Sequence, residues 1–160
     1  MIIVVASEHR GYDGKDGILV QVRKLGHEAL DFGPFNPDMC DYPDFASKAA
    51  LAVSDGNADR AILIGGTGIG MSIVANKFRG VRAALCHDDL STAISRQYVD
   101  ANILCLPMDL LSEETAARMV EVWLTTPFDG GHHARRVEKI TRYEQTIREG
   151  KTISGNGKRP

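Results

Sequence analysis

Residues 60–77, RAILIGGTGIGMSIVANK, decide the fold. Residues 60–64 form a short apolar and β-branched run, which is typical of a strand buried on both faces. Glycines at 65, 66, 68 and 70 follow, and a helical pattern resumes near Ile69. Glycines lack the Cβ that would block a ligand, and a helix start offers unpaired backbone N–H groups and a positive dipole end. The loop is therefore suited to hold an anion.

This glycine loop differs from two familiar phosphate-binding motifs. No Gly-Lys-Ser/Thr closes it as in a Walker loop, and its position and spacing are not those of the dinucleotide fingerprint after a first strand. A tight strand-to-helix turn with no ligand is the alternative interpretation. Residues at the neighbouring strand ends must distinguish the two.

Composition indicates one domain with a small-molecule partner. The chain has 160 residues, 43% of them hydrophobic, and 19 basic against 21 acidic side chains. No dense basic run indicates a nucleic-acid partner, and no apolar run reaches membrane-spanning length. The three cysteines (Cys40, Cys86 and Cys105) show no paired spacing, so we expect neither disulfides nor a metal site. A soluble, cytoplasmic protein is predicted.

Strand and helix patterns alternate along the chain. Apolar runs at 1–6, 28–32, 60–64, 81–86 and 102–106 predict five strands. Helical patterns separate them, including one from about Asp44 to Asp55. Such alternation implies crossover connections, hence an α/β three-layer αβα sandwich with a five-stranded parallel sheet. We expect a single domain over 1–149 and a disordered polar tail over 150–160.

The last predicted helix, from about His132, is polar with a narrow apolar stripe. Its apolar positions are Val137, Ile140 and Ile147. A helix this polar, arriving after the sheet is complete, is expected to extend to a partner subunit.

Polar side chains follow the predicted strands where each one ends. They are Glu8-His9, Asp41-Tyr42, the glycine loop and His87-Asp88, and we expect His132, Arg135 and Arg136 to add positive charge from the last helix. Carboxylate, imidazole, backbone N–H groups and arginine together suit an acidic small molecule such as a sugar phosphate. The matching chemistry is proton transfer beside a carbonyl through an enediolate. For Asp41 and Tyr42, a helix cap and a packed aromatic are the alternative roles.

Several motifs in fixed order resemble a known family. They are Ser7-Glu8-His9, Asp41-Tyr42-Pro43, Gly65 to Gly70 with Ala75-Asn76-Lys77, Ser95-Arg96-Gln97 with Asn102, and Gly130-Gly131 with Arg136-Val137-Glu138. The chain is similar to ribose-5-phosphate isomerase B and its galactose-6-phosphate isomerase relatives over nearly its whole length. The resemblance implies a Rossmann-like or flavodoxin-like fold and aldose-ketose isomerisation of a phosphorylated sugar, with ribose 5-phosphate and ribulose 5-phosphate or a related pair as substrate. It also implies no metal, nucleotide or other cofactor, and a homodimer or tetramer whose active site is shared between subunits.

The resemblance also implies the site residues. Catalytic positions are Glu8, Gly65, Thr67 and Tyr98, and substrate-binding positions are Glu8, His9, Tyr42, Gly66, Thr67, Gly68, Ile69, Gly70, Val99, Asp109, His132 and Arg136. Residues 66–70 would form the backbone anion hole.

Several of these positions depart from the family pattern. The family's cysteine base belongs at Gly65, and the glutamate base of another branch belongs at Met71. A ring-opening histidine is expected at Tyr98, an asparagine at Val99, and arginines at Asp109 and His132, whereas Arg136 is retained.

We therefore consider Glu8, which stands for the family's aspartate with one more methylene, as the replacement base. Cys40 and Tyr98 are the alternatives. Three functions follow: an isomerase with an altered base or substrate, a catalytically impaired ligand-binding or regulatory relative, and one chain of a two-chain isomerase.

Overall fold

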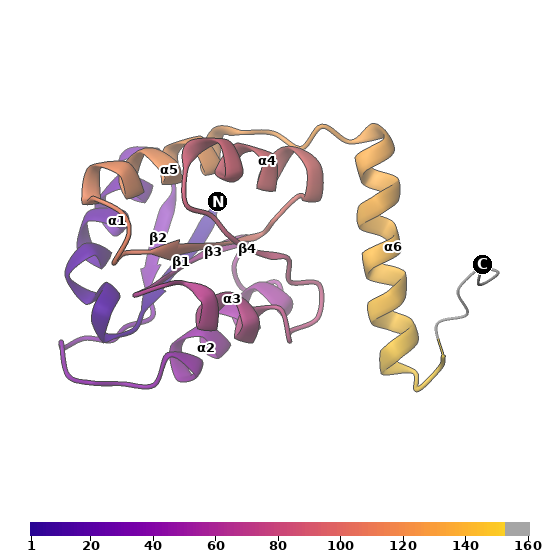
Figure 1. The fold of residues 1–160 in the computed structure, drawn as a ribbon, viewed down its shortest axis with the longest axis horizontal. Helices are drawn as coiled ribbons and strands as arrows, with labels where there is room; N and C mark the ends of the chain where they lie inside the picture. The colour runs from indigo at the N-terminus through magenta and orange to yellow at the C-terminus, as the bar shows by residue number, and fades with distance from the viewer. Residues whose placement is uncertain (153–160) are drawn as a thin grey trace.

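The computed structural model describes residues 1–152, which form a five-stranded sheet with helices on both faces. Every strand pair is parallel, and the strand order is β2-β1-β3-β5-β4. The strands are β1 (Ile2–Ser7), β2 (Glu28–Asp31), β3 (Arg60–Gly65), β4 (Ala83–Leu85) and β5 (Ile103–Pro107). The predicted α/β Rossmann-like class is thereby confirmed (Figure 1).

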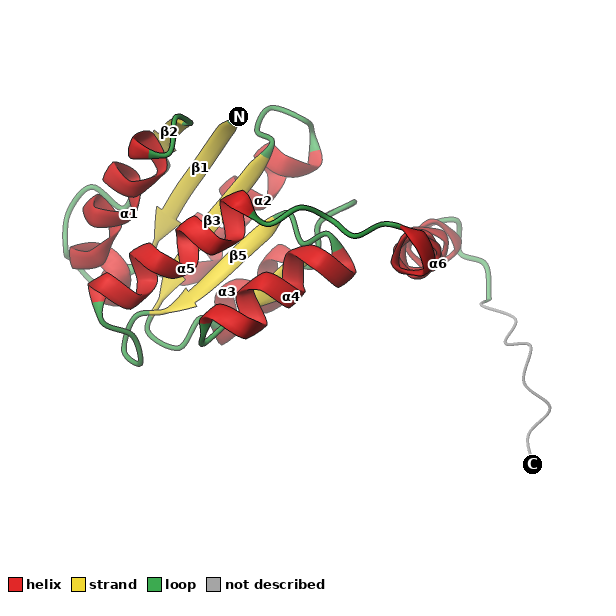
Figure 2. Ribbon diagram, turned by 90° about the horizontal axis from the view of Figure 1, so that it is seen from above, coloured by secondary structure: helices red, strands yellow, loops and turns green. Residues whose placement is uncertain are grey.

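Helices cover both faces of this sheet, and the last helix stands apart from them (Figure 1). They are η1 (His9–Gly11), α1 (Tyr12–Lys24), α2 (Tyr42–Ser54), α3 (Ile69–Ala75), α4 (Asp89–Val99), α5 (Glu113–Thr125) and α6 (Gly131–Arg148). Helices α1, α4 and α5 cover one face, and α2 and α3 cover the other (Figure 2). No helix among the described residues is both long and apolar enough to cross a membrane.

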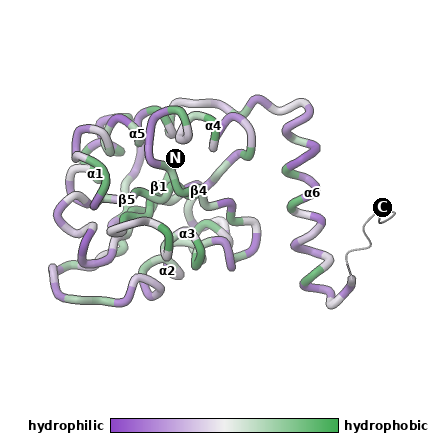
Figure 3. Tube along the Cα trace, in the orientation of Figure 1, coloured by the Kyte–Doolittle hydropathy of each residue, from purple (hydrophilic) through white to green (hydrophobic). Residues whose placement is uncertain are grey.

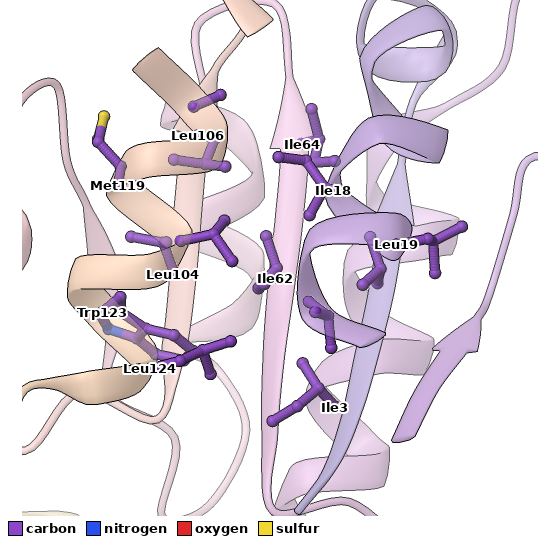
Figure 4. Close-up of a cluster of buried hydrophobic side chains, with 14 of the residues drawn as sticks. Ile3, Ile18, Leu19, Ile62, Ile64, Leu104, Leu106, Met119, Trp123 and Leu124 are labelled. Carbon is purple, nitrogen blue, oxygen red and sulfur yellow. The ribbon is translucent and has the colours of Figure 1, made fainter. Parts of the chain in front are cut away.

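Strand side chains alternate between two cores, which explains the continuous apolar runs of the sequence. Ile62, Ile64, Leu104 and Leu106 face α1 and α5, where Trp123 is fully buried (Figure 4). The opposite core is built from smaller residues, because α2 presents Ala46, Ala49, Ala50 and Ala52 to the sheet. Both faces therefore exclude water, and the polar chemistry is confined to the strand ends.

Two elements begin two residues away from their predicted starts. The strand expected over 81–86 covers only Ala83–Leu85, because side chains rather than strands take its first N–H groups: Arg82 N donates to Asn102 Oδ1 and Ala83 N to Asn76 Oδ1. Helix α2 begins at Tyr42 instead of Asp44, since Pro43 fits the first turn of a helix, where its missing N–H costs nothing.

Helix α6 stands away from the rest of the domain (Figure 1). Its first turn contacts α4, and farther along Glu144 accepts hydrogen bonds from Gly80 N at 3.0 and 3.1 Å. Ile140 and Ile147 are 48% and 64% exposed, and the helix is mostly hydrophilic (Figure 3). Packing on a partner stays a prediction. Of the tail predicted to be disordered, residues 153–160 lie outside the described part of the chain.

Candidate active site

A pocket of about 240 Å³ opens at the carboxyl edge of the sheet. It lies where β1 and β3 end and α2 begins, the place where open parallel sheets bind ligands. Its lining residues are Glu8, His9, Arg10, Tyr42, Gly65, Gly66, Thr67, Gly68, Gly70 and Met71. Three of the predicted polar groups, from 8–9, 42 and 65–70, are thus brought together.

Glu8 is the buried carboxylate of this pocket. It is 6% exposed and directly follows β1. Its Oε1 accepts a hydrogen bond from Gly66 N at 2.7 Å, and Oε2 accepts one from Arg10 N at 3.0 Å. Each carboxylate oxygen has two lone-pair directions, so these bonds fix Glu8 and still leave it acceptor capacity.

His9 is oriented by its neighbours on both sides. Its Nδ1 lies 2.8 Å from Glu8 Oε2 and 3.2 Å from the carbonyl oxygen of Cys40. Both of these oxygens are acceptors and lie closer than the Cys40 N–H, which is 3.5 Å from Nδ1, so we assign the ring proton to Nδ1. Nε2 then has no hydrogen-bond partner within residues 1–152 and is available to a ligand.

The loop that carries Cys40, residues 33–41, is held at its start by Lys15 and Asp31. Lys15 is 2% exposed, and its Nζ lies 2.7 and 2.9 Å from the Asp31 carboxylate oxygens and donates to Pro34 O at 2.6 Å. Asp31 Oδ1 also accepts from Gly33 N. This ion pair anchors the start of the 33–41 loop, and the end of that loop positions His9 and Tyr42.

Glycine at 66 and 68 follows from the local geometry. Gly68 has a φ of +69°, a left-handed conformation that side-chain-bearing residues rarely adopt, and it caps the start of α3. At Gly66, a Cβ would lie 2.7 Å from both Arg10 Nε and Asp109 Oδ2. Within residues 1–152, the N–H groups of Thr67 and Gly68 donate to no acceptor, so the loop keeps two adjacent donors free.

An ion pair between Arg10 and Asp109 covers Gly66. Arg10 Nη2 lies 2.5 Å from Asp109 Oδ2, and Arg10 Nε donates to Asp109 Oδ1 at 3.2 Å. The family resemblance implies that Asp109 is a substrate-binding position, and it implies no role for Arg10. The available signal was its place directly after Glu8-His9, at the carboxyl end of β1.

The positions implied for a base carry no base. Gly65 has no side chain, and a Cβ there would lie 3.2 Å from Met71 Cγ and 3.6 Å from Glu8 Oε1. Met71 is 1% exposed and belongs to the apolar core. The space beside position 65 is therefore bordered by Met71 and by the longer side chain of Glu8.

The remaining predicted positions lie elsewhere in the chain. Helix α4 runs back from the carboxyl edge, so Tyr98 and Val99 lie at its far end, next to α6. Tyr98 stacks on His133 with ring centroids 4.3 Å apart, and the ring centroids of His132 and His133 are 3.9 Å apart. Neither this group nor Arg136 lines the pocket, and the strand arrowheads point away from α6 (Figure 2).

Three other candidates also do not line the pocket. Ile69 is 52% exposed on α3. His87 and Asp88 follow β4, but Asp88 caps α4, where Oδ1 accepts from Ser91 N at 2.6 Å. Hydrogen bonds from Ser91 lower the pKa of Asp88, which is the behaviour of a helix cap.

The described residues form no cluster of metal-ligating side chains. Within residues 1–152, no group of three or more His, Cys, Asp and Glu side chains is placed to hold a metal ion. The pocket offers instead a carboxylate, an imidazole and free N–H groups, which suit proton transfer on a small polar molecule.

Comparison with known proteins places this geometry in a family. The family model described as Ribose/Galactose Isomerase matches residues 3–140. The chain is 41% identical over 143 residues to ribose-5-phosphate isomerase B of Escherichia coli, covering 89% of this chain and 96% of that protein. It is also 41% identical over 146 residues to a putative sugar phosphate isomerase of Bacillus subtilis, covering 91% and 98%.

Solved structures agree with the sequence relatives. Ribose-5-phosphate isomerase B of Clostridium thermocellum superposes with a TM-score of 0.89 at 44% identity, covering 92% of this chain and 99% of that one. The same enzyme of Mycoplasma genitalium, with bound ribulose-5-phosphate, gives a TM-score of 0.87 at 38% identity, covering 90% and 96%. With these matches and the pocket at the carboxyl edge of the sheet, the chain belongs to the ribose/galactose isomerase family.

Proposed function

We propose that this protein is an aldose-ketose isomerase of a phosphorylated sugar and that Glu8 is its base. Family membership supports the reaction class, since the relatives include ribose-5-phosphate isomerases. The observation that carries the choice of Glu8 is its place: the carboxylate lines the pocket 3.6 Å from where a side chain at position 65 would begin.

The proposed reaction moves one carbon-bound proton between neighbouring carbons. Glu8 takes the proton from C2 of the aldose, and the electrons of that C–H bond form the C1–C2 double bond of an enediolate as the C1 carbonyl opens. The proton returns to C1, and the carbonyl forms at C2. The free N–H groups of Thr67 and Gly68 would stabilise the developing oxyanion, while His9 Nε2 would exchange the hydroxyl proton.

Two alternative bases fit less well. Burial raises the pKa of the Cys40 thiol, and nearby Glu8, Asp41 and Asp44 raise it further, against a lowering hydrogen bond with His9. Cys40 would then hold its proton near neutral pH, and it does not line the pocket. Tyr98 packs against His133 at the other end of α4.

The implied site positions that lie near α6, away from the pocket, support a site shared between subunits. Tyr98, His132 and Arg136 gather around the start of α6, away from the pocket of the same chain. At about 240 Å³, that pocket is smaller than the roughly 300–1,000 Å³ typical of ligand sites. A homodimer or tetramer in which one subunit's α6 completes the partner's pocket would join the two groups.

Solvent-deuterium incorporation next to the carbonyl tests the base. Purified protein is incubated in D2O with ribose 5-phosphate, ribulose 5-phosphate and other sugar phosphates. We expect exchange by the wild type and a loss of about 10²–10⁴-fold in Glu8→Gln. Glu8→Asp, which shortens the side chain by one methylene, should also lose most exchange because the carboxylate is withdrawn from the substrate.

The controls separate chemistry from folding. Glu114→Gln changes an exposed glutamate on α5 and should exchange like the wild type. Circular dichroism and thermal melting establish that each Glu8 variant is folded. Undiminished exchange in folded Glu8→Gln would refute Glu8 as the base. No exchange by the wild type with any sugar phosphate would favour the ligand-binding or two-chain alternatives.

A further inference from the structure

The Arg10–Asp109 pair joins three segments at the mouth of the pocket. Arg10 lies in η1 after β1, Gly66 lies after β3, and Asp109 lies after β5. Asp109 N donates to Gly66 O at 3.0 Å, and the two side chains close over the glycine, where a Cβ would lie 2.7 Å from each. The contact thus depends on glycine at 66.

One edge of the Arg10 guanidinium remains unused. Asp109 binds Nε and Nη2, whereas Nη1 has no acceptor within residues 1–152. The Arg10 side chain is 60% exposed and lines the pocket, beside the two free N–H groups of the glycine loop. A planar guanidinium held by a carboxylate keeps a fixed direction for its remaining donors.

Arg10 is the cation that this chain itself supplies to the pocket. Glu8 and Asp109 place two carboxylates near the pocket, and Arg10 is the only lysine or arginine among the described residues that line it. Without Arg10, a phosphate entering the pocket would meet these two carboxylates with no compensating cation from the described part of the same chain.

We propose that Arg10 binds the anionic group of the substrate and determines selectivity for phosphorylated ligands, with Asp109 as its positioning residue. This inference rests on the proposed function for the identity of the ligand. It assigns to Asp109 an indirect role, through Arg10, in place of the direct substrate contact that the resemblance implies.

Calorimetric titration with ribose 5-phosphate and with inorganic phosphate tests the proposal, because binding is read out without turnover. A charge-assisted hydrogen bond contributes enough that Arg10→Met should weaken both ligands about tenfold or more. Arg118→Met is the matched control: Arg118 also forms an ion pair, with Asp89 at 2.7 Å, but lies outside the pocket, so its affinities should match the wild type.

A double variant in which the residues at positions 10 and 109 are exchanged gives the decisive comparison. Arg10→Asp alone should bind ribose 5-phosphate more weakly still, whereas Arg10→Asp with Asp109→Arg returns a guanidinium to the space over Gly66 and should recover affinity to within about threefold of the wild type. Unchanged binding in Arg10→Met, or no recovery in the exchanged pair, would overturn the proposal.

The results also separate this inference from the isomerase proposal. Arg10-dependent binding without deuterium exchange would support anion binding by Arg10 and refute the proposed isomerisation. Turnover whose KM is indifferent to Arg10→Met would refute Arg10 and leave the reaction standing. A wild type that binds neither ligand and exchanges nothing would refute both.

Discussion

At the scale of single residues, two departures from the family pattern in the pocket are each matched by a related group on a neighbouring residue. Gly65 lacks the side chain that the family pattern implies, and Glu8 is one methylene longer than the implied aspartate and lies next to the vacated space. Asp109 has the opposite charge to the implied arginine, and it pairs with a guanidinium supplied by Arg10. In both cases a group lost at one position is matched by a related group at a neighbour, so the pocket keeps a carboxylate base candidate and a cation.

Restoring the cysteine tests how closely the remaining pocket still matches the family pattern. A Cβ at 65 would be 3.2 Å from Met71 Cγ, a contact that a flexible methionine can relieve by a small shift. We expect Gly65→Cys to gain ribose 5-phosphate isomerisation, with kcat/KM at least tenfold above that of Gly65→Ala. Gly65→Ala is the matched control, since it fills the same space without a thiol. Equal rates in the two variants would show that the pocket is no longer arranged for that substrate.

At the scale of elements, the contact between α4 and α6 depends on stacked rings. Tyr98 and His133 are nearly parallel, at 7° between ring planes, and Asp129 N donates to Gln97 O just before α6 begins. Burial lowers the pKa of His133 below its ordinary 6.5, and the positive neighbours His132 and Arg136 lower it further, against Asp129. The neutral imidazole is therefore the form that suits the docked helix.

This pKa shift predicts that docking of α6 weakens in acid. Because its pKa is lowered, His133 binds fewer protons in the folded chain than in the unfolded chain. The contribution of His133 to the docking of α6 is therefore complete above pH 6.5 and is lost as the pH falls through the lowered pKa. Hydrogen-exchange protection factors of α6 should be lower at pH 5.5 than at 7.5, and His133→Phe should remove most of the difference. An NMR titration that places the pKa of His133 above 6.5 would contradict this account.

At the scale of the whole molecule, one chain carries two separate halves of the expected site. The pocket holds Glu8 and His9, whereas Tyr98 and the basic start of α6 lie elsewhere. A groove of about 910 Å³ also separates α6 from α2 and from the segment after α3. Both features are those of a subunit that docks α6 on a partner, which remains a prediction.

Mixing inactive variants tests whether the site is shared. Glu8→Gln disables one half of the proposed site and Arg136→Met the other, so each homodimer lacks activity. Chains unfolded together and refolded at equal concentration should regain roughly a quarter of wild-type activity, because half of the dimers are mixed and each mixed dimer has one intact site. Two Glu8→Gln preparations mixed in the same way serve as the control. No recovery, with mixed dimers detected by mass spectrometry, would contradict a site shared in this way.

The sequence predicted much of this architecture but less of the site. Residues 60–64 and the glycines after them specified a buried strand and a turn into a helix, and β3 and α3 confirm both. Helix bounds were less accurate because capping and proline decide them locally, as at Tyr42 and Pro43. The Arg10–Asp109 pair was missed because 99 positions separate its members, and only the parallel pairing of β1, β3 and β5 brings them together.

The sequence by itself determined the class of fold and the chemistry available at each strand end. Hydrophobic periodicity and glycine placement are local properties of the sequence. They predict secondary structure wherever burial and backbone conformation are compatible with a single type of element. Only the tertiary structure decided which of those groups meet: Glu8 beside Gly65, Arg10 on Asp109, and Tyr98 away from the pocket on His133. Side-chain convergence depends on strand order and helix direction, because both place residues distant in sequence at the same edge of the sheet.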